Sequence, residues 1–254
     1  MKPLGWVLLG LGVLIIITFV LCLYLLKPKK MRVYIPKDIY ICYKTVEDLP
    51  PEVVNRWKRL NPEYKVHVYG DAECRSFIEE TYGKAYADFF ASIPSGPIKA
   101  DFWRVCILYA KGGVYADADI EPLVPIGDFL EEGIELCTCS SFRGNPNLSI
   151  NPHFIIVKPH HPLLKKCIDL MFEKRKLPFD YWSYSITRIM YQVLKEAFPN
   201  LKRHQEGLYK GKLQMIEEVN LNPSNEHAIH CVYKKKRVLN NRSRNYDPAN
   251  HVFK

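Results

Sequence analysis

Apolar residues recur along the chain at two spacings, which together predict alternating strands and helices. Short, mostly apolar runs bounded by polar turns are typical of strands, and they cover residues 38–43, 66–69, 136–140 and 154–157. Longer segments with apolar residues three or four apart are typical of helices, and they cover residues 50–61, 71–82, 84–92, 161–174 and 182–197. Strands that alternate with helices favour an α/β layer arrangement.

Residues 97–123 predict a helix, a glycine break and a short strand in immediate succession. Gly96-Pro97 suits the start of a helix, and Gly112-Gly113 suits its end. The strand is expected to end in Asp117-Ala118-Asp119. Since successive side chains in a strand alternate between faces, Asp117 and Asp119 are expected to project together.

Two neighbouring carboxylates repel each other unless a cation lies between them. Mg²⁺ and Mn²⁺ prefer carboxylate, water and phosphate oxygens, so Asp117 and Asp119 predict a metal-diphosphate site. A third acid, Asp101, falls on the packing face of the preceding helix, with Arg104 as a candidate partner three residues on. The alternative is that Asp101 and Arg104 form a purely structural ion pair.

The segment from Leu4 to Leu26 contains no charged residue and is long enough to cross a bilayer as a helix. We therefore expect residues 1–30 to be a membrane anchor and residues 31–254 to form one folded domain. A cleaved signal peptide is the alternative, although its apolar part is usually only about 7–15 residues long. The basic residues just after the anchor favour a cytosolic domain, because positive charge tends to stay cytoplasmic.

Charge and cysteine content add expectations about nucleic acid binding and about disulfides. The net charge of +9 is concentrated near the anchor and in Lys234-Lys235-Lys236-Arg237. No nucleic-acid-binding motif accompanies these patches, so we expect no nucleic acid partner. One of the 8 cysteines, Cys22, falls in the predicted anchor, which leaves an odd number that cannot all pair within one chain. Cys137 and Cys139 fall in an apolar strand pattern, where we expect small buried thiols.

Several residues around the acids form a longer string with fixed spacing. It consists of Lys99-Ala100-Asp101, Arg104, Leu108, Gly112-Gly113, Tyr115 and Asp117-Ala118-Asp119. This string resembles the signature of glycosyltransferase family 32, the DXD-containing sugar-binding family, which includes fungal N-glycan and inositolphosphoceramide mannosyltransferases. Residues 35–40 are similar to the family's opening strand, and residues 57–64 to its "W-x-x-x-N-P-x-Y" segment. The resemblance covers residues 35–125.

The resemblance implies a GT-A fold, an α/β sandwich around a mixed, mostly parallel sheet. It also implies a retaining transferase that uses Mn²⁺ or Mg²⁺ and moves mannose, galactose or glucose from a nucleotide-diphosphate sugar to a glycan or glycolipid acceptor. By resemblance, Asp119 coordinates the metal and Asp117 holds the ribose and the metal or its waters. Asp101 and Arg104 would fix the nucleotide and donor sugar, and Tyr115 belongs to the same donor-binding signature.

The resemblance also suggests four positions outside the signature. Asn151 precedes a strand near the sugar in family members, although an Asn-Pro pair also favours an ordinary turn. Trp182 and Ser185 fall where related enzymes place a loop over donor and acceptor, although a tryptophan at a helix start also packs on its neighbours. His230 matches the C-terminal histidine that completes the metal shell in many GT-A enzymes, and an ordinary surface or hydrogen-bonded histidine is the alternative.

Two questions stay open from the sequence. Golgi relatives place the catalytic domain in the lumen behind an N-terminal anchor, where the sequons at residues 147–149 and 241–243 would be usable, so the lumen of the Golgi or ER and the cytosol are both open as locations. A nucleotide-sugar hydrolase and a noncatalytic, membrane-tethered sugar- or lipid-binding module are the alternative functions. The chain has no GxSxG, HExxH, Walker A or GxGxxG motif, which argues against the corresponding hydrolase, protease and nucleotide-binding classes.

Overall fold

The computed structural model describes residues 16–18, 33–141, 150–220, 229–241, 246–247 and 252–253. The chain divides into two units, Met1–Arg32 and Val33–Lys254. Apart from three helical positions at residues 16–18, the predicted anchor lies outside the described residues and stays a prediction from the sequence. Within the described ranges, no helix combines the length and the apolar character that a bilayer-spanning helix needs.

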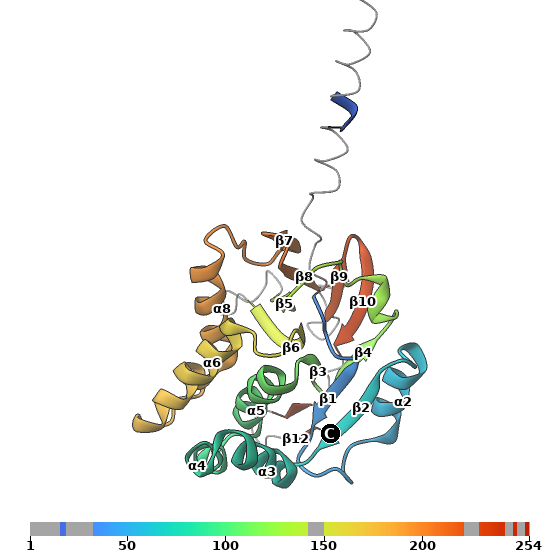
Figure 1. Cartoon of the computed structure of the whole chain (residues 1–254). Coiled ribbons are helices and arrows are strands. Elements are labelled where there is room, and N and C mark those ends of the chain that lie inside the picture. Colours follow the sequence, from blue (N-terminus) through green and yellow to red (C-terminus); the bar gives the residue numbers. More distant parts are fainter. Residues whose placement is uncertain are drawn as a thin grey trace, which may run out of the picture. The chain divides into compact units, whose positions relative to one another are not determined.

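The first half of the larger unit alternates strands with helices, as the apolar spacing predicts (Figure 1). Its elements are β1 (Asp38–Cys42), α2 (Pro51–Leu60), β2 (Lys65–Tyr69), α3 (Asp71–Tyr82), α4 (Lys84–Ser92), α5 (Gly96–Lys111) and β3 (Gly113–Ala116). The second half is richer in strands than we expected. Its elements are β4 (Ile120–Pro122), η1 (Ile126–Asp128), β5 (Leu136–Ser140), β6 (Ile150–Val157), α6 (Pro162–Glu173), η2 (Lys174–Lys176), α7 (Tyr181–Tyr184), α8 (Ile186–Ala197), β7 (Gly207–Tyr209), β8 (Leu213–Asn220), β9 (Ile229–Tyr233), β10 (Lys236–Asn241), β11 (Tyr246–Asp247) and β12 (Val252–Phe253).

The predicted helix at residues 182–197 is two helices, α7 and α8. Ser185 has extended backbone angles, with φ −62° and ψ 129°, which interrupts the helical path. Its side-chain oxygen accepts a hydrogen bond from the backbone N–H of Thr187 and so caps α8.

The main sheet has the strand order β2-β1-β3-β6-β5-β8-β9-β10-β4, with β7 paired to β8. The expectation of a mostly parallel sheet is wrong. Among the described strands, only β1–β2, β1–β3 and β5–β8 pair in parallel, and the other pairs in this sheet are antiparallel. Short connections in the second half account for part of this, because a tight turn such as that between β9 and β10 can join only antiparallel strands.

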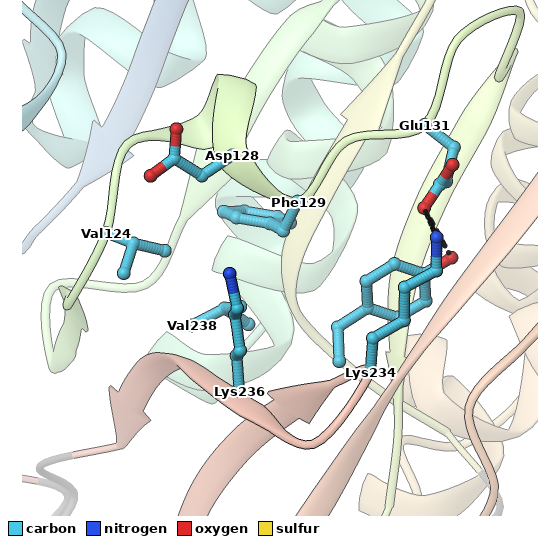
Figure 2. A pocket seen from close by; sticks show the side chains of 8 residues that line it. Val124, Asp128, Phe129, Glu131, Lys234, Lys236 and Val238 are labelled. Carbon is cyan, nitrogen blue, oxygen red and sulfur yellow. Dashed lines mark hydrogen bonds and ion pairs between the residues drawn. The ribbon is translucent and has the colours of Figure 1, made fainter.

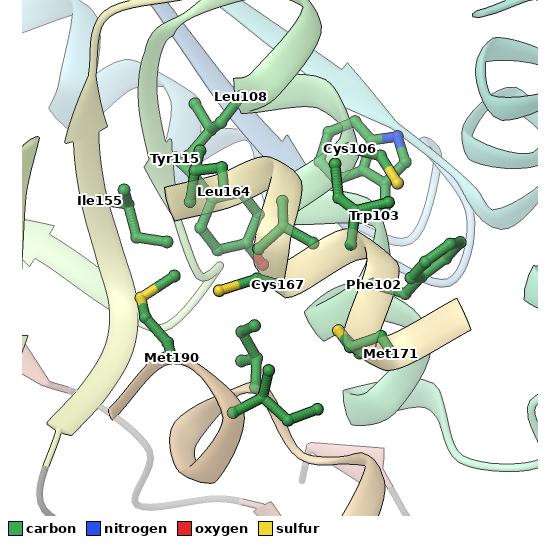
Figure 3. Close-up of a cluster of buried hydrophobic side chains, with 14 of the residues drawn as sticks. Phe102, Trp103, Cys106, Leu108, Tyr115, Ile155, Leu164, Cys167, Met171 and Met190 are labelled. Carbon is green, nitrogen blue, oxygen red and sulfur yellow. The ribbon is translucent and has the colours of Figure 1, made fainter. Parts of the chain in front are cut away.

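Apolar side chains cover both faces of the sheet. On one face, α3, α4, α5, α6 and α8 pack against residues such as Tyr115, Ile155 and Val157. Figure 3 shows Tyr115 and Ile155 of the sheet beside Leu164 of α6 and Met190 of α8. On the other face, α2 and η1 pack against Val114, Phe154 and their neighbours. The sheet is therefore a buried central layer, and α5 is itself buried at every position from Asp101 to Leu108.

The Gly112-Gly113 break sets the distance between α5 and β3. The backbone N–H of Gly112 donates to Leu108 O and closes α5. Both glycines have positive φ, +67° and +93°, a conformation that side chains other than hydrogen disfavour. A Cβ at Gly113 would also lie 2.6 Å from the carbonyl oxygen of Asp38 in β1. The pair thus lets β3 enter the sheet directly after α5.

Candidate active site

Asp117 and Asp119 lie in a tight turn after β3. The prediction that the strand extends through Asp119 is wrong, because β3 ends at Ala116. The N–H of Asp117 donates to His153 O over 2.8 Å, and the N–H of Ile120 donates to Asp117 O over 3.0 Å. The chain must turn here because β4 pairs with β10 at the far end of the strand order. The turn, and not strand alternation, therefore sets the relative position of the two carboxylates.

Arg104 of α5 joins the turn to the helix. Its Nη2 lies 3.0 Å from Asp101 Oδ1 and 3.1 Å from Asp117 Oδ1. Its Nη1 donates to the carbonyl oxygen of Pro152, in β6, over 2.6 Å. The guanidinium is almost fully buried, and its planar fork can contact several acceptors at once. The predicted pairing of Asp101 with Arg104 is therefore present, and Asp117 belongs to the same network.

Tyr115 supports the same carboxylate from β3. Its hydroxyl donates to Asp117 Oδ1 over 2.5 Å, and the Arg104 guanidinium lies 4.5 Å from the centre of its ring. The Tyr115 side chain is completely buried. Its contacts therefore position Asp117 and Arg104.

The three acids are held in an environment that disfavours their charge. Burial raises the pKa of Asp101 to about 6, although Arg104 opposes the shift. Burial also raises the pKa of Asp117. Burial and the neighbouring Asp117 carboxylate together raise the pKa of Asp119 to about 7. When all three acids are ionised, they outnumber the Arg104 charge by two, an excess that one divalent cation would neutralise.

Ser185 is part of this network, whereas Trp182 lies on the surface. The backbone N–H of Ile186 donates to Asp101 Oδ2 over 3.0 Å, and the Ser185 side chain hydrogen-bonds the same carboxylate. The start of α8 is thus fastened to α5. Trp182 is 40% exposed and packs against Tyr181 and the Arg188 guanidinium. Packing of this kind is the alternative to a role in a loop over donor and acceptor.

Asn151 and His230 have other neighbours than the acids. Asn151 Nδ2 donates to Glu218 Oε1 in β8 over 3.1 Å. His230 in β9 pairs with Asn240 in β10, which pairs with Glu121 in β4. Two strand spacings, about 9.5 Å, therefore separate the His230 backbone from the strand that follows Asp119. In the described part of the chain, the three candidate metal ligands that converge within 4.8 Å are Cys139, His153 and Cys231. The role of His230 as the third ligand of a metal bound by the acids stays a prediction.

Sequence reasoning missed the contribution of β6 and β8 to the site. Pro152 and His153 offer their backbone carbonyl oxygens to Arg104 and Asp117, which no side-chain pattern reveals. Glu218 is buried beside His153. The signal that could have identified it was weak, because Glu218 is one of two adjacent acids in the strand LQMIEEVN.

A pocket of about 150 Å³ lies away from these acids, between η1 and the β9–β10 hairpin (Figure 2). Val124, Phe129 and Val238 form its apolar wall, and Lys234 and Lys236 stand at its edge. The pocket shares no residue with the acidic network.

Residues 50–135 match the family described as "Glycosyltransferase sugar-binding region containing DXD motif". The initiation-specific alpha-1,6-mannosyltransferase of Candida albicans is 38% identical over 76 residues, which is 29% of this chain and 20% of that protein. The enzyme of the same name from Schizosaccharomyces pombe is 32% identical over 101 residues, 38% of this chain and 26% of that protein. Inositol phosphoceramide mannosyltransferase 3 of S. pombe is 35% identical over 89 residues, 34% of this chain and 24% of that protein. The aligned parts span about a fifth to a quarter of these relatives.

Among solved structures, the PaToxG glycosyltransferase superposes with a TM-score of 0.54. The alignment covers 65% of this chain and 71% of that chain at 14% sequence identity. At this identity the likeness concerns the fold alone.

Proposed function

We propose, from the premise that this chain belongs to the DXD-containing glycosyltransferases similar to family 32, that it transfers a hexose from a nucleotide-diphosphate sugar to a glycan or glycolipid acceptor with the help of a divalent cation. The observation that carries the proposal is the network in which Arg104 bridges Asp101 and Asp117, with Asp119 beside it. Mannose, galactose and glucose are all candidate sugars.

The residues of the turn fit a hard divalent cation. Asp117 and Asp119 supply carboxylate oxygens, which Mg²⁺ and Mn²⁺ prefer. Among the described residues, no side-chain cation forms an ion pair with Asp119, whereas Asp117 already contacts Arg104. Asp119 is therefore the better first ligand, and Asp117 is suited to a shared role. The excess of two negative charges supports the same assignment.

The position of the turn also fits a nucleotide. β1, β2 and β3 are parallel, and ligands of such sheets bind outside the carboxyl ends of the strands. The Asp117 turn follows the carboxyl end of β3, and Asp71 follows that of β2. The signature residue Lys99 forms an ion pair with Asp71 over 2.8 Å, so in our proposal the signature spans this edge of the sheet.

Transfer requires that the bond between the anomeric carbon and the diphosphate oxygen breaks while a bond to the acceptor oxygen forms. A bound cation supplies positive charge where the diphosphate leaves. Arg104 keeps Asp117 fixed and partly neutralised, and Asp101 keeps Arg104 in place. The Tyr115 hydroxyl makes the second contact with the Asp117 carboxylate. We assign no nucleophile or base to a side chain, and an oxygen of the departing diphosphate can accept the proton of the acceptor hydroxyl.

The decisive experiment screens the full-length chain against UDP- and GDP-sugars with and without Mn²⁺, measuring nucleotide release and sugar transfer separately. We expect release that depends on Mn²⁺, is selective for one donor and increases when a glycan or glycolipid acceptor is added. Release without transfer to any acceptor would instead identify a nucleotide-sugar hydrolase. Binding without release would identify a noncatalytic module.

A further inference from the structure

A second cluster of potential ligands lies behind the acidic turn, in the interior of the sheet. Cys139 of β5, His153 of β6 and Cys231 of β9 present ligand atoms that all lie within 4.8 Å of one another. All three side chains are buried. Cys231 lies 92 residues after Cys139 and 78 after His153, so the fold itself brings it to the other two.

The distances within this cluster match those around a tetrahedral metal ion. Cys139 Sγ and Cys231 Sγ are 3.8 Å apart, and His153 Nε2 is 3.4 Å from Cys231 Sγ. Zn²⁺ binds sulfur at about 2.3 Å and imidazole nitrogen at about 2.0–2.1 Å, which in a tetrahedron puts two sulfurs about 3.8 Å apart and sulfur and nitrogen about 3.5 Å apart. Only small shifts would therefore be needed to admit the ion.

Glu218 supplies the outer partner that a metal-bound histidine usually has. Its Oε1 lies 3.2 Å from His153 Nδ1, the nitrogen that faces away from the two sulfurs, and Asn151 donates to the same oxygen. The His153–Glu218 contact is within ion-pair distance but does not meet hydrogen-bond geometry. A carboxylate 3.2 Å from Nδ1 favours the tautomer that carries its proton on Nδ1, which leaves the Nε2 lone pair for a metal.

The charges that the cluster would carry as ligands also favour a divalent ion. Two buried thiolates are costly by themselves, whereas a doubly charged ion between them would neutralise both.

A disulfide fits the two cysteines less well. Strand β8 lies between β5 and β9, so their backbones are two strand spacings apart, about 9.5 Å. The Cα atoms of a disulfide are usually about 4.4–6.8 Å apart. A metal bridges the longer separation because each sulfur contacts the ion and not the other sulfur.

We propose that Cys139, His153 and Cys231 bind one Zn²⁺ ion, with Glu218 as the outer partner of His153 and a water in the fourth position. This site is separate from the acidic turn, and it differs in chemistry because thiolate ligands select soft metals. It is also connected to the turn, because the backbone carbonyl oxygen of His153 accepts a hydrogen bond from the N–H of Asp117. Zinc would thus stiffen β6, the strand that accepts the hydrogen bond from Asp117.

The test measures zinc by mass spectrometry in the full-length chain after a wash with EDTA that removes loosely held cations. We expect about one zinc per chain in the wild type and loss of that zinc in Cys139→Ala and Cys231→Ala. Cys167→Ala is the matched control, because Cys167 is an equally buried thiol in α6, outside the cluster. Asp119→Asn should keep its zinc, which separates this site from the proposed transfer site.

A second measurement does not depend on whether the variants fold. Wild-type protein exchanged with Co²⁺ should show thiolate-to-cobalt charge transfer in the near-ultraviolet spectrum, and chelation of the bound metal should lower the melting temperature. The proposal is overturned if the wild type holds no zinc and shows no such band with Co²⁺. Zinc content unchanged in Cys231→Ala, or a Cys139–Cys231 disulfide found by peptide mass analysis, would equally overturn it.

Discussion

The backbone N–H of Asp117 donates to the carbonyl oxygen of His153 over 2.8 Å. This bond continues the pairing of β3 with β6 for one position after β3 ends. It fixes the beginning of the acidic turn to a strand whose side chains are buried in the sheet. The position of the Asp117 carboxylate therefore depends on the packing of β6 as well as on its own contacts with Arg104 and Tyr115.

Asp119→Asn should abolish transfer and leave the fold intact. The substitution removes one charge from the side chain that we propose as the first metal ligand, and lost electrostatic stabilisation of this kind costs at least about 100-fold in rate. Steady-state transfer with a Mn²⁺ titration measures the effect. Asp128→Asn is the control, because Asp128 is an exposed acid in η1. Transfer by Asp119→Asn at the wild-type rate would remove the site assignment.

Mn²⁺ binding should weaken in acid. The pKa of Asp119 is raised from 3.8 to about 7, so below pH 7 a proton competes with the cation, and affinity should fall by up to about tenfold per pH unit. Titration calorimetry between pH 5.5 and 8.5 measures this, with the plateau expected above pH 8. Equal affinity at pH 5.5 and 8.5 would contradict it.

The raised pKa of Asp119 also predicts how the stability of the metal-free protein depends on pH. The folded protein holds the Asp119 proton more tightly than the unfolded chain, so this group contributes stability below about pH 4 that is lost as the pH rises through about 7. Asp119→Asn removes this contribution. Urea unfolding should therefore show a smaller decrease between pH 5 and 8 for the variant than for the wild type, and parallel curves would refute the assignment.

Tyr115→Phe should lower the rate of transfer by more than its loss of folding stability explains. The change keeps the buried ring but removes the hydroxyl that donates to Asp117, and one lost hydrogen bond to a charged group is worth about 1.5–3 kcal/mol. Tyr184→Phe is the matched control, because its buried hydroxyl donates to the backbone of η2 and the residue after it. We expect a similar loss of stability in both variants and a loss of kcat in Tyr115→Phe alone.

Arg104→Ala should destabilise the fold by about 3–5 kcal/mol, because it leaves Asp101 buried without its partner. Arg104→Lys keeps the charge but not the fork that reaches Asp101, Asp117 and Pro152 together, so it should recover part of the stability and little of the activity. Urea denaturation and transfer assays measure the two effects. Arg59→Ala, at an exposed position of α2, should change neither, and a similarly small effect in Arg104→Ala would contradict a bridging role.

The sequence predicted the local part of the site well. Helix α5, the glycine break and the neighbouring acids lie within one continuous stretch, and local spacing specifies such stretches. The pairing of Asp101 with Arg104 followed from their separation of three residues on a helix. Such features follow from local spacing and do not depend on how distant strands pair.

The non-local part of the site was not predictable in the same way. Asp117 contacts the backbone of His153, and Asp101 contacts the N-terminus of α8. Both contacts depend on how strands and helices far apart in the sequence pack, which a single sequence does not specify. The expectation of a mostly parallel sheet was wrong for the same reason, because hairpins such as β9–β10 and non-consecutive pairs such as β3–β6 are antiparallel. Cys139 was correctly expected to be buried from its strand pattern, whereas its proximity to Cys231 came from the strand order.

The second motif of the resemblance, around Trp57 and Asn61, should prove structural. The Trp57 ring stacks on Phe154 with ring centres 6.0 Å apart. The completely buried side chain of Asn61 accepts a hydrogen bond from the N–H of Ile126 over 2.8 Å and donates to Trp57 O. These contacts join the end of α2 to η1, beyond the acidic turn in the sequence.

Asn61→Ala should therefore lower the free energy of unfolding by about 1–3 kcal/mol, since it leaves the buried N–H of Ile126 without its acceptor. The Michaelis constant for the donor should stay unchanged at a temperature where the variant is folded, because the side chain does not contact the acidic network. Asn55→Ala is the matched control, as Asn55 lies exposed on the same helix and its loss should cost less than about 0.5 kcal/mol. If Asn61→Ala instead raised the Michaelis constant and left stability unchanged, the motif would belong to the donor site and not to the scaffold.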